Sequence, residues 1–140
     1  SVSLRYFTVY GPGMRPDLAI NIFTSKALKN EPIIIFGDGN KTRDFTYVDD
    51  IVDANMLASK NGSGIYNVGG GHRITINDLA EKIIEITRSS SQIIYKEAVP
   101  GDAIHTSANT ELIQKELGWN PKITLDEGLK RYITWVSEFQ

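Results

Sequence analysis

The 140-residue sequence contains no cysteine, which excludes disulfide bonds and metal sites built on thiolates. The same absence is typical of proteins from reducing compartments, so we expect a cytoplasmic location. There are only two histidines, His72 and His105, and they are too few and too far apart for a metal cluster. We therefore predict no bound metal and interpret both histidines as surface residues.

Long apolar runs and an excess of charge are also missing. No segment approaches the ~18 apolar residues of a membrane span, and the N-terminus lacks the apolar core of a signal peptide. With 15 basic and 17 acidic residues the formal charge is −2, which argues against a nucleic-acid partner. The length and the 41% hydrophobic content predict one compact core rather than two domains.

Strand-like and helix-like segments alternate along the chain, and this alternation predicts an α/β fold. The predicted strands are 2–10, 33–36, 43–48, 65–68 and 92–95. The predicted helices are 17–28, one from Asp49 or Asp50 to about 61, 75–88, 109–118 and one that begins after Thr124.

Local signals mark several helix ends. Thr75 with Asp78, and Thr124 with Glu127, have the spacing of capping boxes. Gly118 is expected to end the helix that Asn109 begins. The triplet Gly69–Gly71 follows a strand, but no G-x-G-x-x-G pattern accompanies it, so we interpret it as turn geometry.

The stretch "GDGNKTRDFTYVDD" (37–50) places an arginine at the start of an alternating segment, just after a glycine turn. Alternation predicts a half-buried strand, with Arg43, Phe45 and Tyr47 on one face and Asp44, Thr46 and Val48 on the other. A hairpin explains the glycines but not the position of the arginine. Arg43 could simply pair with Asp44 or with a helix C-terminus.

The first strand carries apolar side chains on both faces, as central parallel strands do. Such a strand needs neighbours on both sides, and 65–68 supplies only one of them. The other edge is therefore expected to pair with protein outside these 140 residues, and we expect a homo-oligomer.

Five motifs together resemble the NAD-dependent nucleotide-sugar epimerases and dehydratases, within the extended short-chain dehydrogenase/reductase family. In chain order they are "LRYFTVYGPGMRPDLA", "IIIFGDGNKTRDFTYVDDIVDA", "GIYNVGGG", "PGD" and "LGWNPKITLDEGL". The resemblance covers nearly the whole chain but only the C-terminal half of such proteins. It implies that residues 1–140 form a single C-terminal nucleotide-sugar-binding region: a small substrate-binding domain plus terminal strands and a helix of an incomplete Rossmann-like sheet. The N-terminal NAD-binding region is expected to be absent.

The resemblance also implies a set of ligand contacts. Arg43 would hold the diphosphate or ribose, the backbone of 34–36 would lie along the uracil, and Asp102 would accept the ribose hydroxyls. The implied substrate-binding residues are Thr8, Arg15, Ile34, Ile35, Phe36, Arg43 and Asp102, and Phe7 is implied beside the nicotinamide of NAD.

Each of these residues also has an ordinary structural interpretation. Phe7 and Thr8 suit any strand, Arg15 suits a solvated loop, and Asp102 suits a turn after Pro-Gly. Many relatives carry Asn in place of Thr8, Asn in place of Asp17 and Arg in place of Val99.

Within the family, "FTVYGP" followed by "RPD" looks most like the UDP-glucuronate and UDP-glucose 4-epimerases. These isomerases use NAD to oxidise C4 of a UDP-sugar transiently. The Tyr-x-x-x-Lys pair that supplies their base is not present, so we assign no catalytic residue and expect this chain alone to be inactive. A non-catalytic nucleotide-sugar-binding or partner module, and a fragment of a nucleotide-sugar 4,6-dehydratase, are the alternatives.

Overall fold

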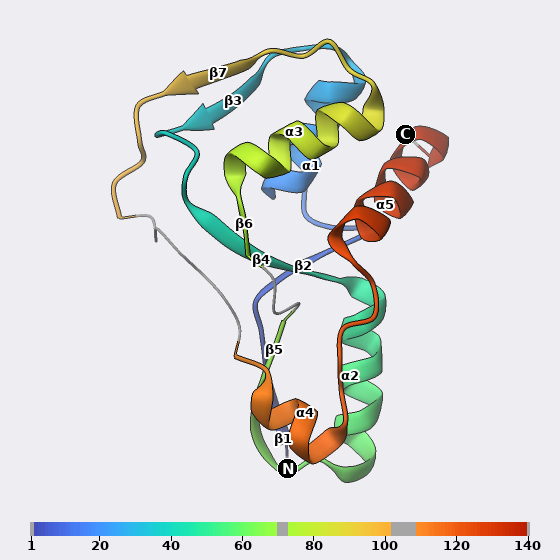
Figure 1. The fold of residues 1–140 in the computed structure, drawn as a ribbon. Helices are drawn as coiled ribbons and strands as arrows, with labels where there is room; N and C mark the ends of the chain where they lie inside the picture. The colour runs from blue at the N-terminus through green and yellow to red at the C-terminus, as the bar shows by residue number, and fades with distance from the viewer. Residues whose placement is uncertain (1, 70–72, 102–108, 140) are drawn as a thin grey trace.

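The computed structural model describes residues 2–69, 73–101 and 109–139. It is elongated: β1, β5, α2 and α4 lie at one end, and α1, α3, α5, β3 and β7 at the other (Figure 1). The elements are β1 Val2–Tyr6, β2 Thr8–Tyr10, α1 Ala19–Leu28, β3 Ile33–Phe36, β4 Thr42–Tyr47, α2 Val48–Asn61, β5 Gly64–Val68, β6 Arg73–Thr75, α3 Ile76–Thr87, β7 Ile93–Lys96, α4 Glu111–Leu117 and α5 Leu125–Phe139. The predicted α/β class is confirmed.

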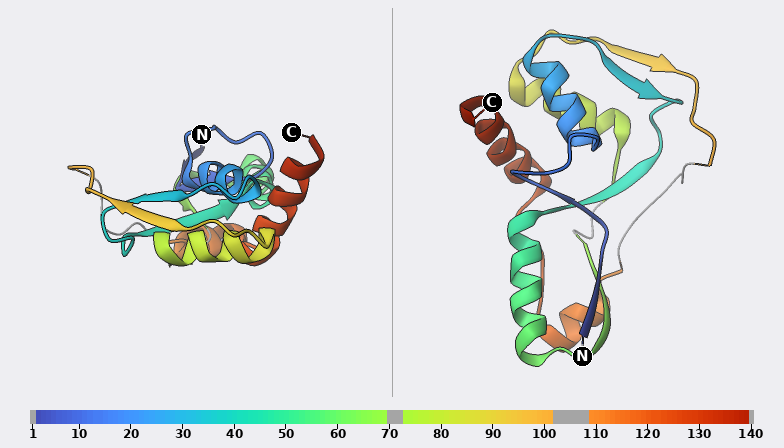
Figure 2. Two further views of the ribbon diagram at one scale, coloured as in Figure 1. Left: turned by 90° about the horizontal axis from the view of Figure 1, so that it is seen from above. Right: turned by 180° about the vertical axis from the view of Figure 1, so that it is seen from behind.

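The strands form three small sheets, of which two are purely parallel pairs. β1 pairs with β5, and β3 pairs with β7, each in parallel. The third sheet has the order β2-β4-β6, with β2 parallel and β6 antiparallel to β4. Long crossings connect these sheets, and Figure 2 shows β2 and β4 spanning the middle of the molecule between its two ends. None of the helices in the described ranges is both long and apolar enough to cross a membrane.

Buried apolar side chains form two clusters, not the one compact core that the length predicts. One cluster joins α2, β5 and α4 and is centred on Tyr66, Ile113 and Trp119. The larger cluster joins α1, α3 and α5 to β2, β3 and β4 and includes Leu79 and Leu129. The larger cluster therefore extends to β2 and β4 in the middle of the molecule, whereas the smaller one lies at the end that holds β5, α2 and α4 (Figure 1).

Two predictions about the first half of the chain need correction. The predicted strand 2–10 is divided at Phe7, because its first part pairs with β5 and its second part pairs with β4. The predicted half-buried strand is instead buried on both faces from Asp44 to Tyr47, and Val48 already belongs to α2. A strand in the middle of a three-stranded sheet covered by helices has no solvent face, which the alternation alone did not reveal.

Most local capping predictions are confirmed. The Thr75 hydroxyl accepts the Asp78 N–H at 3.1 Å, and the Thr124 hydroxyl accepts the Glu127 N–H at 3.2 Å. Gly118 adopts the left-handed conformation (φ 69°) at the end of α4. The predicted cap of α2 is wrong: the helix begins at Val48, so Asp49 and Asp50 lie inside its first turn. Strand β6 was not predicted, because three residues are too few to show a period.

Candidate functional site

A pocket of about 510 Å³ lies where the first strand changes sheets. The Phe7 amide donates to the Val68 carbonyl at 3.2 Å, so the β1–β5 pairing ends at Phe7. The next residue, Thr8, is already opposite Phe45 in the β2–β4 pairing. The lining includes all of β2, the loop that follows it and Val48 just after β4, so the pocket opens at the carboxyl ends of the parallel strands β2 and β4. Crevices outside the carboxyl ends of parallel strands are where open α/β sheets bind ligands.

Three predicted residues line this pocket: Phe7, Thr8 and Arg15. Phe7 and Thr8 are half-buried, as a contact to a ligand face requires. Arg15 is exposed and lies 3.3 Å from the Asp17 carboxylate within the "RPD" loop. The rest of the lining is Val9 and Tyr10 of β2, the loop 11–14, Leu18 and Val48. The structure thus brings the predicted aromatic, hydroxyl and cationic groups to one opening.

Arg43 is half-buried on β4, two residues before the Phe45 that pairs with Thr8. Because side chains on one face of a strand recur every second residue, Arg43 shares its face with Phe45. One guanidinium nitrogen, Nη1, donates to the Thr42 carbonyl at 2.8 Å. The predicted arginine therefore does not line the pocket itself, but it lies on a strand that pairs directly with the pocket wall.

The predicted uracil-binding segment is β3, which projects with β7 beyond the helices (Figure 1). Ile35 is buried in the larger core, Ile34 is half-buried and Phe36 is exposed. β3 pairs with β7 along one edge only, so within the described ranges its other edge carries no strand partner. The backbone N–H and C=O groups on that edge are of the kind that the resemblance assigns to contacts with the uracil base.

The pKa values of the tyrosines near the pocket are shifted in the wrong direction for a tyrosinate base. Burial raises the pKa of Tyr10 well above its usual value, and burial also raises the pKa of Tyr47, with the nearby Asp49 carboxylate adding to the effect. A tyrosine that removes a proton at neutral pH needs a lowered pKa. Tyr10 and Tyr47 are instead core residues, whose rings pack edge to face with centroids 5.4 Å apart.

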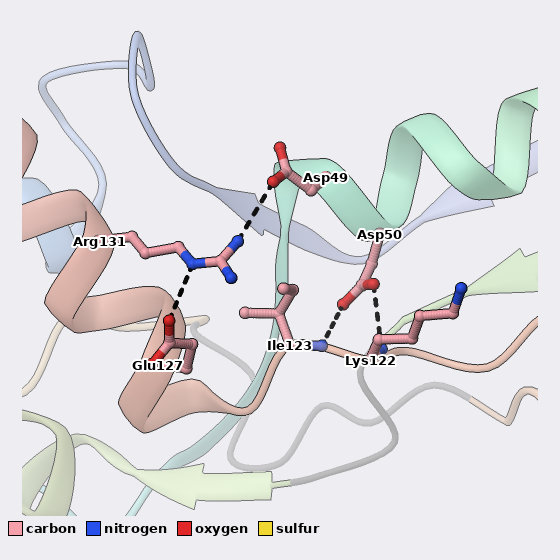
Figure 3. Close-up of polar contacts among 6 residues, drawn as sticks. All are labelled: Asp49, Asp50, Lys122, Ile123, Glu127 and Arg131. Atoms are coloured by element: carbon pink, nitrogen blue, oxygen red, sulfur yellow. Dashed lines mark hydrogen bonds and ion pairs between the residues drawn. The ribbon is translucent and has the colours of Figure 1, made fainter.

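Behind the pocket, Asp50 links α2 to the segment before α5 (Figure 3). Its carboxylate accepts the Lys122 N–H and the Ile123 N–H, each at 3.0 Å, and its carbonyl accepts the Trp119 indole N–H at 2.9 Å. The aspartate predicted to cap a helix therefore caps a distant loop. On the surface above it, Arg131 bridges Asp49 at 3.4 Å and Glu127 at 3.0 Å (Figure 3).

A groove of about 540 Å³ runs along α3 and β6, but none of the predicted ligand residues lines it. Asp102, His72 and His105 lie outside the described residues. Sequence reasoning missed Asn77 and the actual partners of Asp50. The partners of both residues are distant in the chain, so no local pattern could have identified them.

Residues 1–69 match the NAD dependent epimerase/dehydratase family. The chain is 40% identical to the UDP-glucuronate 4-epimerase of Thermodesulfobacterium geofontis over 96% of its own length and 42% of the relative's. It is 38% identical to a putative UDP-glucose 4-epimerase of Methanocaldococcus jannaschii, over 95% of this chain and 44% of that one.

Solved structures agree with these relatives. The Thermotoga maritima UDP-glucose 4-epimerase with UDP-glucose superposes with a TM-score of 0.94 at 38% identity, over 98% of this chain and 46% of that chain. The Bacillus cereus UDP-glucuronic acid 4-epimerase, in complex with UDP-glucuronic acid and NAD, superposes with a TM-score of 0.92 at 33% identity, over 99% and 46%. The chain thus spans under half the length of the proteins it matches.

Proposed function

We propose that this chain is the substrate-binding part of an NAD-dependent UDP-sugar 4-epimerase, since its residues 1–69 match the NAD dependent epimerase/dehydratase family and almost its whole length is similar to UDP-sugar 4-epimerases. The proposed reaction interconverts UDP-glucose and UDP-galactose, or UDP-glucuronate and UDP-galacturonate, by transient oxidation at C4. The observation that carries the proposal is the pocket at the carboxyl ends of β2 and β4, in a chain that superposes almost entirely on epimerases holding UDP-sugars.

In this proposal the residues of the chain bind and orient the sugar nucleotide. Arg43 presents its guanidinium fork to the diphosphate, where bidentate charge-assisted hydrogen bonds fit phosphate oxygens. Thr8 and Arg15 face the sugar from the pocket, and the free edge of β3 serves the uracil. Asp102 is proposed to accept the ribose hydroxyls.

When bound, NAD would supply reversible hydride transfer at C4 of the sugar. The part of the chain that fits this cofactor is Phe7, a half-buried aromatic at the pocket wall that suits a flat nicotinamide ring. We assign no catalytic base to these 140 residues. We propose that the base comes from the part of the full-length relatives that these residues do not match.

We also propose a cytoplasmic homo-oligomer. The support is the apolar surface around the first sheet, where Tyr6 is 43% exposed and Ile65 is 53% exposed. β1 pairs with β5 alone among the described strands, so one of its edges is open to a partner strand.

Replacing Arg43 with alanine tests the proposed function. The change is expected to weaken UDP binding by roughly 1.5–3 kcal/mol, the range for a hydrogen bond to a charged group. Isothermal titration calorimetry on the protein produced from its complete reading frame gives the affinity. Arg73→Ala is the matched control, because it removes the same charge from the adjacent strand β6 and should leave the affinity for UDP unchanged. Equal UDP affinity in wild type and Arg43→Ala would refute the proposed site.

The base and sugar of the nucleotide provide a second test. UDP-glucose is expected to bind about tenfold more tightly than dTDP-glucose, because the deoxyribose leaves the acceptor proposed for the ribose, Asp102, without one hydrogen bond. 2′-Deoxy-UDP separates the effect of the hydroxyl from that of the thymine methyl. Tighter binding of dTDP-glucose would overturn the assignment of the nucleotide.

A further inference from the structure

The turn between β3 and β4 has a backbone that requires support from elsewhere in the fold. Gly37 and Gly39 adopt positive φ values of 85° and 77°, and the Asn40 N–H donates to the Asp38 carboxylate at 2.9 Å. Four residues after Gly39 the chain reaches Arg43. The conformation of this turn therefore sets where β4 begins and where its arginine lies relative to the end of β3.

One side chain from a different element, Asn77 in the first turn of α3, holds this turn. Its amide nitrogen Nδ2 donates to the Asp38 carbonyl at 3.0 Å, and its backbone N–H donates to the Gly39 carbonyl at 3.0 Å. The preceding residue, Ile76, donates its N–H to the Lys41 carbonyl at 3.0 Å. A Cβ added at Gly39 would overlap the Asn77 side chain, so the two residues are in direct contact.

The same asparagine also reaches β7. Its Oδ1 accepts the Tyr95 hydroxyl at 2.8 Å, and Tyr95 is opposite Ile35 in the β3–β7 pairing. Asn77 is thus bonded to the strand beside β3, to the turn that follows β3 and, through that turn, to the start of β4. Under the proposed function, β3 binds the base, and Arg43 at the start of β4 binds the diphosphate.

We propose that Asn77 is a positioning residue that fixes Arg43 and the edge of β3 at the separation that a uridine diphosphate needs. This inference rests on the proposed function. Asn77 is only partly buried and its side-chain hydrogen bonds lie near the solvent, whereas the core contacts of α3 come from Leu79 and Ala80. Its role is therefore to define the shape of the site more than to hold the helix in place.

A double-mutant cycle on UDP affinity tests this role. By calorimetry on the protein produced from its complete reading frame, Asn77→Ala is expected to weaken UDP binding about fivefold to tenfold. In an Arg43→Ala background the same change should weaken binding by less than about twofold, because the group that it positions is gone. Asn77→Asp should resemble alanine, since a carboxylate cannot donate to the Asp38 carbonyl.

Asn55→Ala is the matched control. Asn55 also accepts a tyrosine hydroxyl, that of Tyr6 at 2.6 Å, but it lies on α2, at the end of the molecule away from β3 and β7 (Figure 1). This control should bind UDP as the wild type does. Wild-type affinity in Asn77→Ala, or losses that simply add to those of Arg43→Ala, would overturn the positioning role while leaving the proposed function intact. Wild-type affinity in Arg43→Ala would instead overturn the proposed function and this inference together.

Discussion

Asp50→Ala is expected to lower the free energy of unfolding by about 3–5 kcal/mol, the sum of two hydrogen bonds to a buried charged group. The carboxylate is 1% exposed and accepts the backbone N–H groups of Lys122 and Ile123 at 3.0 Å (Figure 3). Without it, both N–H groups lose their acceptor in a part-buried position. Total stabilities of single domains are about 5–15 kcal/mol, so this variant would be close to unfolding at ordinary temperatures.

Urea denaturation of wild type and variants measures this effect. Asp49→Ala is the matched control: it removes the neighbouring aspartate, whose exposed ion pair with Arg131 at 3.4 Å should contribute less than about 1 kcal/mol. Asp50→Asn should fall between the two, because the amide keeps one acceptor oxygen and turns its NH₂ group toward a backbone N–H. Equal stability of the Asp49 and Asp50 variants would contradict the role assigned to this carboxylate.

Gly128→Ala is the second change for which we expect a large effect. In an ordinary exposed helix this substitution stabilises by about 1 kcal/mol. At this position of α5 a Cβ would overlap the Tyr10 hydroxyl and come within 2.7 Å of Tyr10 Cζ and 3.0 Å of Tyr47 Cδ1. Both rings are buried and packed against each other, so the helix would have to move away from β2, at a net cost of about 2–3 kcal/mol.

A second substitution identifies the cause of that cost. Tyr10→Phe removes the hydroxyl that the new methyl group would meet, so the double variant should recover part of the loss in a thermal melt. Ser137→Ala, on an exposed position of the same helix, should raise the stability slightly through helix propensity. If Gly128→Ala were as stable as the wild type, α5 would not be held against Tyr10 as closely as the structure shows.

The candidate site was predictable where its residues are neighbours in the sequence. Phe7 and Thr8 are adjacent, and Arg15 follows after one glycine-containing turn, so their short spacing favours their lining one pocket. The relation of Arg43 to that pocket was not predictable from spacing. It depends on the parallel pairing of β2 with β4, which joins segments that are 37 residues apart at Thr8 and Phe45.

The sequence by itself determined the α/β class, most elements and several helix ends, because these depend on short-range patterns. Thr75 caps α3 through a residue three positions on, and Gly118 ends α4 because a glycine adopts positive φ at little cost. A continuous apolar run likewise identified β3 as a strand, although its last residue, Phe36, is exposed.

Only the tertiary structure decided the division of the first strand at Phe7, the use of Asp50 and the contacts of Asn77. In each case the partner is far away in the sequence: Val68 for Phe7, Ile123 for Asp50 and Asp38 for Asn77. The same aspartate could cap its own helix or a distant loop, and the choice depends on which backbone N–H groups the packed fold brings within hydrogen-bonding distance. Local sequence patterns do not contain that information, because it arises from the packing of elements that are remote along the chain.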